Sequence, residues 1–196
     1  GVAFGNDECI RLSYAISTPA EREIENYYSS FLYHREQWCN YRIKYLTNNE
    51  KVFKVSLNGN FSCPNRDGKI STKGCLFCSA KGSGDFAGDR NLSIKEQFYQ
   101  ITEKLKDKWK EGSYIAYFQA NTNTYGTVSE LKKRYDQIIK DGTLLDEKIK
   151  ILSIATRPDC LDNDVLNLLS DLNKSIPLWI ELGFQTSNES TANYIN

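Results

Sequence analysis

From residue 51 onward, short β-rich runs alternate with longer segments of helical periodicity, and this alternation constrains the fold more than any other feature. The β-rich runs predict four strands, over residues 51–57, 113–119, 149–155 and 177–184. Four successive units of strand and helix imply parallel strands joined by right-handed crossovers. The expected fold class is therefore α/β, as a closed or partly closed barrel or as an open doubly wound sheet.

The helices expected between these strands have recognisable starts. Ser93 and Thr127 each stand three residues before a glutamate. This is the spacing of a capping box, in which the two side chains satisfy free amides of the first turn. Asp162 is placed to cap a third helix, and residues 187–196 begin a fourth. In either α/β architecture ligands bind at the carboxyl ends of the strands, so the segments that follow the strands are where chemistry is expected.

Composition narrows the class of protein. The 196 residues contain 25 basic and 25 acidic side chains, a balance that argues against bulk electrostatic binding to nucleic acid or to an anionic membrane. The sequence has no apolar stretch long enough to span a membrane and no signal segment at its start, so a cytoplasmic protein without a membrane partner is expected. The six cysteines are then better explained by metal binding or catalysis than by disulfides.

Three of these cysteines follow the first predicted strand. Cys75 and Cys78 form a C-x-x-C pair, and Cys63 precedes them in the same loop. Thiolates select zinc, copper or iron–sulfur clusters, and three ligands leave one coordination position open. A redox C-x-x-C pair would leave Cys63 unexplained. The spacing alone does not decide between zinc and iron–sulfur. A closed zinc site would take its fourth ligand from one of four residues: Cys9, His34, Cys39 or Cys160.

Residues 54–68, 74–79 and 82–88 closely resemble radical-SAM proteins. They are most similar to an uncharacterised subfamily related to the radical-SAM domain of the elongator catalytic subunit. The resemblance continues at the later strand ends and covers roughly residues 40–196. It implies a TIM-like (β/α)6 barrel that is incomplete here, with four parallel β-α units present and the chain truncated at its C-terminus. Strands one and four are then expected to leave unpaired edges.

The resemblance also implies a chemistry. Cys63, Cys75 and Cys78 would hold three irons of a [4Fe–4S] cluster, and the fourth iron would bind S-adenosylmethionine. An electron from the cluster would cleave the sulfonium and release a 5′-deoxyadenosyl radical. Phe77 stands where the family places an aromatic beside the adenine, although a core side chain under the loop is the alternative. The implied electron donor is a flavodoxin or a ferredoxin. RNA is suggested as substrate by the elongator-like relatives, with a small molecule or a peptide equally open.

Polar residues follow the second strand. Gln119, Asn121 and Asn123 occupy the place where the superfamily usually has a Gly-Gly-Glu-like segment that accepts hydrogen bonds from the methionine ammonium. This sequence lacks that triplet, but the carbonyl oxygens of Asn and Gln are also acceptors. The alternative is a plain Asn-rich turn.

The third and fourth strands end in further candidates. Arg157 would bind a carboxylate, of the methionine or of a substrate, or would pair with Asp159 and stiffen the turn. Glu181 and Gln185 match the family's fourth strand, whose end contacts the cofactor's ribose. For Glu181 the alternative is a barrel-interior carboxylate paired with a buried Arg or Lys.

The beginning of the chain differs in character. Residues 1–17 resemble the C-terminal tail of a fold-type I aminotransferase. In that resemblance Arg11 would match an arginine that binds the substrate carboxylate. The match is short, so no pyridoxal phosphate activity is inferred from it. Residues 18–50 are expected to form a helical lead-in and residues 51–196 a partial barrel. The sequence as a whole is interpreted as a radical-SAM enzyme fragment of weak or no activity. The alternative is a zinc-stabilised α/β binding module that uses Cys160 as its fourth ligand.

Overall fold

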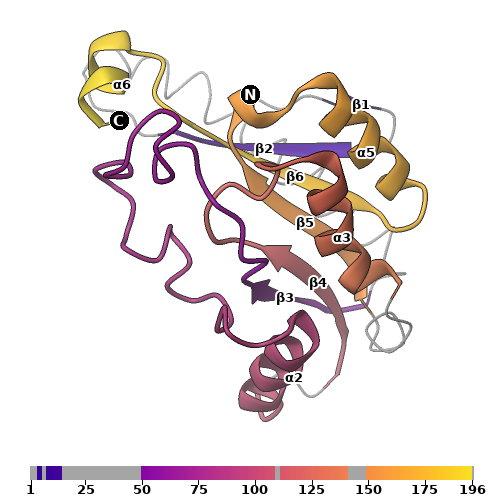
Figure 1. Ribbon diagram of the computed structural model, residues 1–196. Helices are drawn as coiled ribbons and strands as arrows, with labels where there is room; N and C mark the ends of the chain where they lie inside the picture. Colours follow the sequence, from indigo (N-terminus) through magenta and orange to yellow (C-terminus); the bar gives the residue numbers. More distant parts are fainter. Residues whose placement is uncertain (1–3, 6–7, 15–49, 109–110, 141–148, 196) are drawn as a thin grey trace, which may run out of the picture.

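The computed structural model describes residues 4–5, 8–14, 50–108, 111–140 and 149–195 (Figure 1). Its described strands form one six-stranded sheet in the order β1-β2-β6-β5-β4-β3. The strands are β1 (Phe4–Gly5), β2 (Glu8–Tyr14), β3 (Val52–Leu57), β4 (Ser113–Phe118), β5 (Ile149–Thr156) and β6 (Leu178–Gln185). The helices are α2 (Ile94–Leu105), α3 (Val128–Ile139), α5 (Asn163–Asn173) and α6 (Glu189–Ile195), with a 3-10 turn η1 (Pro158–Cys160) after β5.

The α/β class predicted from the sequence is confirmed. Strands β3, β4, β5 and β6 pair in parallel, each with the next in the chain. Both predicted capping boxes are formed, at Ser93 and at Thr127, and Asp162 accepts a hydrogen bond of 2.9 Å from the backbone amide of Val165. The predicted helical lead-in lies outside the described residues except for residue 50, and so does the side chain of Arg11.

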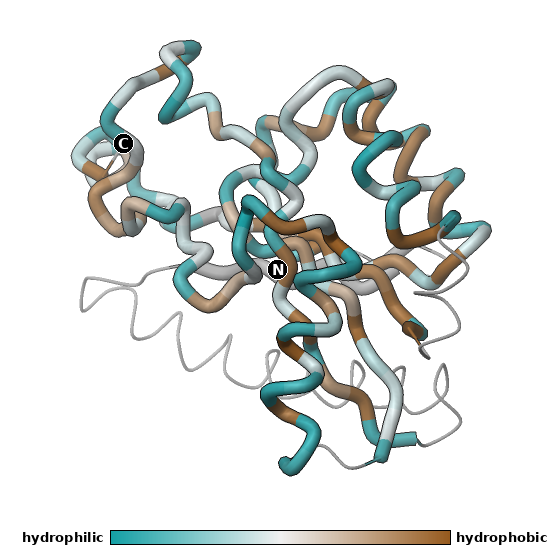
Figure 2. Tube along the Cα trace, turned by 60° about the horizontal axis from the view of Figure 1, so that its bottom comes forward, coloured by the Kyte–Doolittle hydropathy of each residue, from teal (hydrophilic) through white to brown (hydrophobic). Residues whose placement is uncertain are grey.

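The core lies between the sheet and helices α2, α3 and α5, which cover one face of the sheet (Figure 1). Figure 2 shows hydrophilic and hydrophobic positions alternating along these helices, as amphipathic helices on a sheet require. On β3 the burial alternates strictly, so that Val55 and Leu57 are buried while Lys54 and Ser56 face the other side. The largest fully buried side chains are Tyr135, Phe98, Phe118, Leu57, Leu131, Ile138, Ile151, Leu152, Ile154, Leu178 and Gln97.

One expectation about the sheet is wrong. The fourth predicted strand, β6, does not end the sheet, because β2 pairs with it in parallel from Cys9 opposite Trp179 to Tyr14 opposite Gln185. The backbone of residues 8–14 thus supplies the hydrogen bonds that an edge strand would lack. Within the described residues β3 stands at one edge of the sheet, as expected, and β1 at the other. These strands do not close into a complete barrel.

None of the helices in the described segments is long and apolar enough to cross a membrane.

Candidate functional site

A cavity of about 520 Å³ lies where the four parallel strands β3 to β6 end. Its walls come from the segments that follow each of these strands, as parallel topology predicts. All predicted site residues except Asn123 line it. They are Cys63, Cys75, Phe77, Cys78, Gln119, Asn121, Arg157, Glu181 and Gln185.

The long loop after β3 is folded by its own backbone hydrogen bonds. The carbonyl of Cys63 accepts from the amides of Arg66 at 2.8 Å and Asp67 at 3.1 Å. The amide of Cys78 donates to the carbonyl of Cys75 at 3.0 Å, which closes a tight turn around the C-x-x-C pair. The loop therefore presents its sulfurs from ordered turns.

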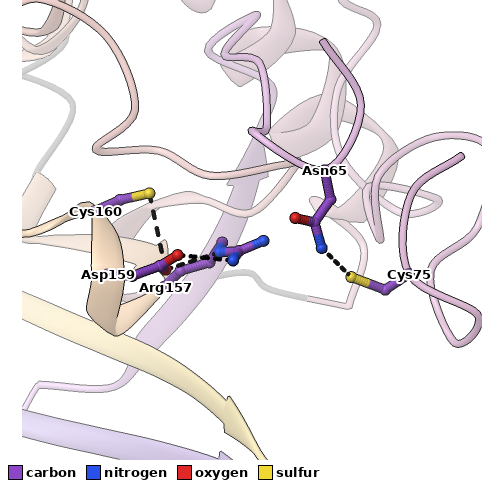
Figure 3. Close-up of polar contacts among 5 residues, drawn as sticks. All are labelled: Asn65, Cys75, Arg157, Asp159 and Cys160. Atoms are coloured by element: carbon purple, nitrogen blue, oxygen red, sulfur yellow. Dashed lines mark hydrogen bonds and ion pairs between the residues drawn. The ribbon is translucent and has the colours of Figure 1, made fainter. Parts of the chain in front are cut away.

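Two neighbouring residues of this loop donate to sulfur. The side-chain amide of Asn65 donates to Cys75 Sγ at 2.9 Å (Figure 3). The Arg66 guanidinium donates to Cys78 Sγ at 3.3 Å and also to the backbone carbonyl of Ser79. The sequence analysis did not identify Asn65 and Arg66 as donors to sulfur. Their position between the cysteines is the feature of the sequence that could have indicated it.

The described cysteines are Cys63, Cys75, Cys78 and Cys160, and no disulfide joins any two of them. Among the described residues, no three Cys, His, Asp or Glu side chains are grouped closely enough to hold a metal ion. The hydrogen bond to Asp159, and after it the interaction with Cys63, raise the pKa of the Arg157 guanidinium. The chemistry of the donor set nevertheless fits an iron–sulfur cluster, because three soft sulfur ligands line one cavity and two of them already accept N–H donors.

The end of β4 interlocks with this loop. Asn121 has a φ of 62° and donates from its side-chain amide to the carbonyl of Phe61 at 3.1 Å. Gly82, with a φ of +64°, lies so close that a Cβ there would be 2.0 Å from Asn121 Oδ1. Gln119 donates to the carbonyl of Ser83 at 3.1 Å. The side-chain nitrogens of Asn121 and Gln119 thus anchor the loop to the end of β4.

Asn123 is placed differently from the prediction. Its side chain is fully buried and does not line the cavity. Its amide nitrogen donates to the carbonyls of Ala155 at 2.7 Å and Phe118 at 3.1 Å, joining the ends of β5 and β4. Asn123 therefore has a structural role beneath the site, whereas the sequence had predicted a direct contact with a cofactor ammonium.

The predicted ion pair after β5 is present. Arg157 donates from Nε and from Nη2 to the two carboxylate oxygens of Asp159, at 2.9 and 2.8 Å (Figure 3). Hydrogen bonds from Arg157 hold the pKa of Asp159 below its usual range. Because Arg157 also lines the cavity, the pair fixes the direction of a guanidinium at its wall.

On β6, Glu181 has the partner that the sequence left unnamed. Lys54 Nζ lies 2.6 Å from Glu181 Oε1 and 3.9 Å from the centre of the Tyr117 ring. The Glu181 side chain is 16% exposed and lines the cavity together with Gln185, whose φ is 61°. Glu181 is thus paired with a lysine, as the alternative interpretation had it, but Lys54 is 34% exposed rather than buried.

Cys160 lies apart from the cavity lining. Burial, followed by the negative charge of Asp159, raises the pKa of its thiol to about 11. Its backbone carbonyl accepts a hydrogen bond of 2.6 Å from the Thr124 hydroxyl, which also contacts Thr156. These contacts give the η1 turn a buried polar anchor.

Comparison with known proteins identifies relatives in three organisms, and the names of these relatives state no function. The chain is 52% identical over 146 residues to the uncharacterized protein YtqA of Bacillus subtilis, covering 74% of this chain and 44% of YtqA. It is 38% identical to protein YhcC of Escherichia coli K12, in a match that covers 75% of this chain and 45% of YhcC. It is 32% identical to the uncharacterized protein MJ0486 of Methanocaldococcus jannaschii, in a match that covers 75% of this chain and 44% of MJ0486. The chain thus spans less than half the length of these relatives. No family model and no solved structure matches it.

The chemistry available at the cavity is set by what lines it. Cysteine sulfurs and their N–H donors come from the loop after β3, whereas amide and carboxylate oxygens come from the ends of β4 and β6. The half-exposed ring of Phe77 is an apolar surface beside the sulfurs. This arrangement suits a soft metal centre together with a polar small molecule.

Proposed function

We propose that this chain carries the cluster-binding and S-adenosylmethionine-binding part of a radical-SAM enzyme. The observation that carries the proposal is a cavity at the carboxyl ends of four parallel strands, which Cys63, Cys75 and Cys78 line together with polar residues from the ends of β4, β5 and β6. The resemblance of the loop sequence to radical-SAM proteins is independent of that geometry.

Cys63, Cys75 and Cys78 would be the ligands of a [4Fe–4S] cluster. Three protein ligands leave one iron open to a second ligand. When bound, the cluster supplies the electron that cleaves the sulfonium bond of S-adenosylmethionine, while the protein binds, orients and shields the reactants. An electron donor such as a flavodoxin or a ferredoxin would be the partner.

The remaining lining residues provide contacts of the right kind for S-adenosylmethionine. Phe77 offers a ring face to the adenine. The carbonyl oxygens of Gln119 and Asn121 are acceptors for the ammonium, and the oxygens of Glu181 and Gln185 are acceptors for the ribose hydroxyls.

Arg157 is suited to the methionine carboxylate. Asp159 uses only part of the guanidinium's donor fork, so further N–H groups can face the cavity. A bidentate pair with Asp159 also prevents the long side chain from sampling other directions.

The size of the cavity agrees with this ligand. Small-molecule sites commonly enclose roughly 300–1,000 Å³, and this cavity measures about 520 Å³. The zinc-stabilised alternative takes Cys160 as its fourth ligand. That thiol lies outside the cavity lining, and its pKa is raised to about 11, which opposes the thiolate form that binds metals.

Binding of S-adenosylmethionine to the anaerobically reconstituted chain tests the proposal. We expect the electron paramagnetic resonance spectrum of the reduced cluster to change when S-adenosylmethionine is added, because the cofactor binds the open iron. Glu181→Gln and Arg157→Met should weaken that change at a given cofactor concentration, whereas Arg134→Met, outside the cavity, should not. A reduced cluster whose spectrum is indifferent to S-adenosylmethionine would contradict the proposal.

A further inference from the structure

The C-x-x-C sulfurs share an unusual local feature, which is that consecutive residues donate to both of them. Asn65 donates to Cys75 Sγ at 2.9 Å and Arg66 donates to Cys78 Sγ at 3.3 Å. Figure 3 shows the Asn65 amide directed at the Cys75 sulfur. We propose that Asn65 and Arg66 hold the two thiolates and stabilise negative charge on them, and so set the reduction potential of the cluster. This inference rests on the proposed function.

The loop backbone explains why both donors reach their sulfurs. The Arg66 amide donates to the Cys63 carbonyl at 2.8 Å, and the Gly74 amide donates to the Asn65 carbonyl at 2.7 Å. These bonds fold the segment back on itself, so that residues 65–66 lie against residues 74–78. A long interval between the first two cysteines is what makes this return possible.

Both donors are held in place before any cofactor binds. Asn65 is 1% exposed. The Arg66 guanidinium also donates to the carbonyls of Ser79 and Ala80. Gly74, with a φ of +75°, lies so near that a Cβ there would be 3.3 Å from the guanidinium carbon. Because these donors are already held in position, little conformational entropy is lost when they stabilise additional negative charge on the sulfurs.

The direction of the effect follows from electrostatics. Reduction adds negative charge that is shared between the irons and their thiolate ligands, and N–H donors to those sulfurs stabilise it. The donors therefore raise the potential of the cluster. Arg66 should act more strongly than Asn65, because it adds a full positive charge to its hydrogen bond.

The experiment compares Asn65→Leu and Arg66→Met with matched controls in the full chain. Asn91→Leu removes an amide of the same loop that donates to Asp89. Arg90→Met removes a guanidinium of the same loop that donates to Asn60. Each protein is reconstituted with iron and sulfide, and its midpoint potential is measured by redox titration followed in the visible spectrum. That readout does not depend on catalysis.

We expect the potential to move to more negative values in both test variants, by more in Arg66→Met, and to stay at the wild-type value in both controls. Loss of iron from a folded test variant, with both controls fully loaded, would also support the proposal. A loaded test variant with the wild-type potential would overturn it.

Two further measurements cover the cases in which a test variant does not fold or the wild-type chain binds no iron. If Asn65→Leu or Arg66→Met does not fold, Asn65→Ala and Arg66→Ala, which also remove the donor, are titrated in their place under the same criteria. A wild-type chain that takes up no iron would refute the proposed function itself. This outcome is distinct from the failure of the inference, in which the wild type is loaded and the variants match it.

Discussion

Lys54 Nζ lies 2.6 Å from Glu181 Oε1, although the two residues belong to strands β3 and β6, which β4 and β5 separate. Neighbouring strands are about 4.8 Å apart, so the pair reaches across three strand spacings. It does so on the face opposite the helices, over the ring of Tyr117 on β4. Side chains from strands this far apart come into contact when the sheet curves toward the face that carries them, as the sheet of a barrel does.

Lys54→Met tests the value of this pair. We expect it to lower the free energy of unfolding by about 1–2 kcal/mol, because it leaves the mostly buried Glu181 carboxylate without its cation. Urea unfolding of Lys54→Met, Glu181→Leu and the double variant gives the coupling between them. Additive losses in the double variant would show that the two side chains do not interact in solution.

Gly82→Ala should disrupt the junction between the cysteine loop and β4. The added Cβ would lie 2.0 Å from Asn121 Oδ1, at a positive φ. We expect a loss of about 2–3 kcal/mol in unfolding free energy, since backbone strain and a clash add. Gly68→Ala is the matched control, because it has a φ of +95° but its nearest neighbour is 3.8 Å away. Strain alone should cost about 1 kcal/mol there, and equal losses in both variants would refute the close packing at Gly82.

Stability should fall in acid because of the helix caps. Hydrogen bonds from Ser93 hold the pKa of Glu96 below its ordinary value of 4.5, and hydrogen bonds from Thr127 do the same for Glu130. A pKa that is lower in the folded state contributes stability above the ordinary value and loses it as the pH falls through the folded value. We therefore expect Glu96→Gln/Glu130→Gln to be less stable than wild type near neutral pH.

The two unfolding free energies should converge as the pH falls below about 4.5. Thermal or urea unfolding across this range measures the difference. Glu103→Gln, which removes a carboxylate of the same helix α2 away from its start, is the control. A difference between the capping variant and wild type that stays constant with pH would contradict the assignment.

Cys160 should be a slow nucleophile in the metal-free protein. Burial raises the pKa of its thiol to about 11, so only roughly one-thousandth of it is thiolate at about pH 8. We expect iodoacetamide to alkylate it far more slowly than it alkylates glutathione, as followed by peptide mass spectrometry. Alkylation at the rate of glutathione would show that the η1 turn exposes this thiol.

The strand and helix boundaries from residue 51 onward were predictable because their signals are local. Capping boxes at Ser93 and Thr127 mark helix starts within four residues of sequence, and the burial of β3 follows its own alternation. The gathering of Cys63, Arg157 and Glu181 around one cavity was also predictable, since it follows from parallel topology alone.

Contacts between distant segments were not predictable in the same way. The pairing of β2 with β6 joins residues 8–14 to residues 178–185 through backbone hydrogen bonds, which carry little sequence signature. Asn123 was assigned to the site by position, but its amide is used by the carbonyls of Ala155 and Phe118. The choice of Lys54 as partner of Glu181 depends on sheet curvature, which no local pattern encodes.

The most direct test of the account is the iron, sulfide and zinc content of the chain after anaerobic reconstitution with iron and sulfide. We expect about four irons and four sulfides per chain, as a [4Fe–4S] cluster requires. Both should be lost in each of Cys63→Ala, Cys75→Ala and Cys78→Ala and retained in Cys160→Ala. Bound zinc without iron, or loss of the metal in Cys160→Ala, would contradict it and favour a closed zinc site.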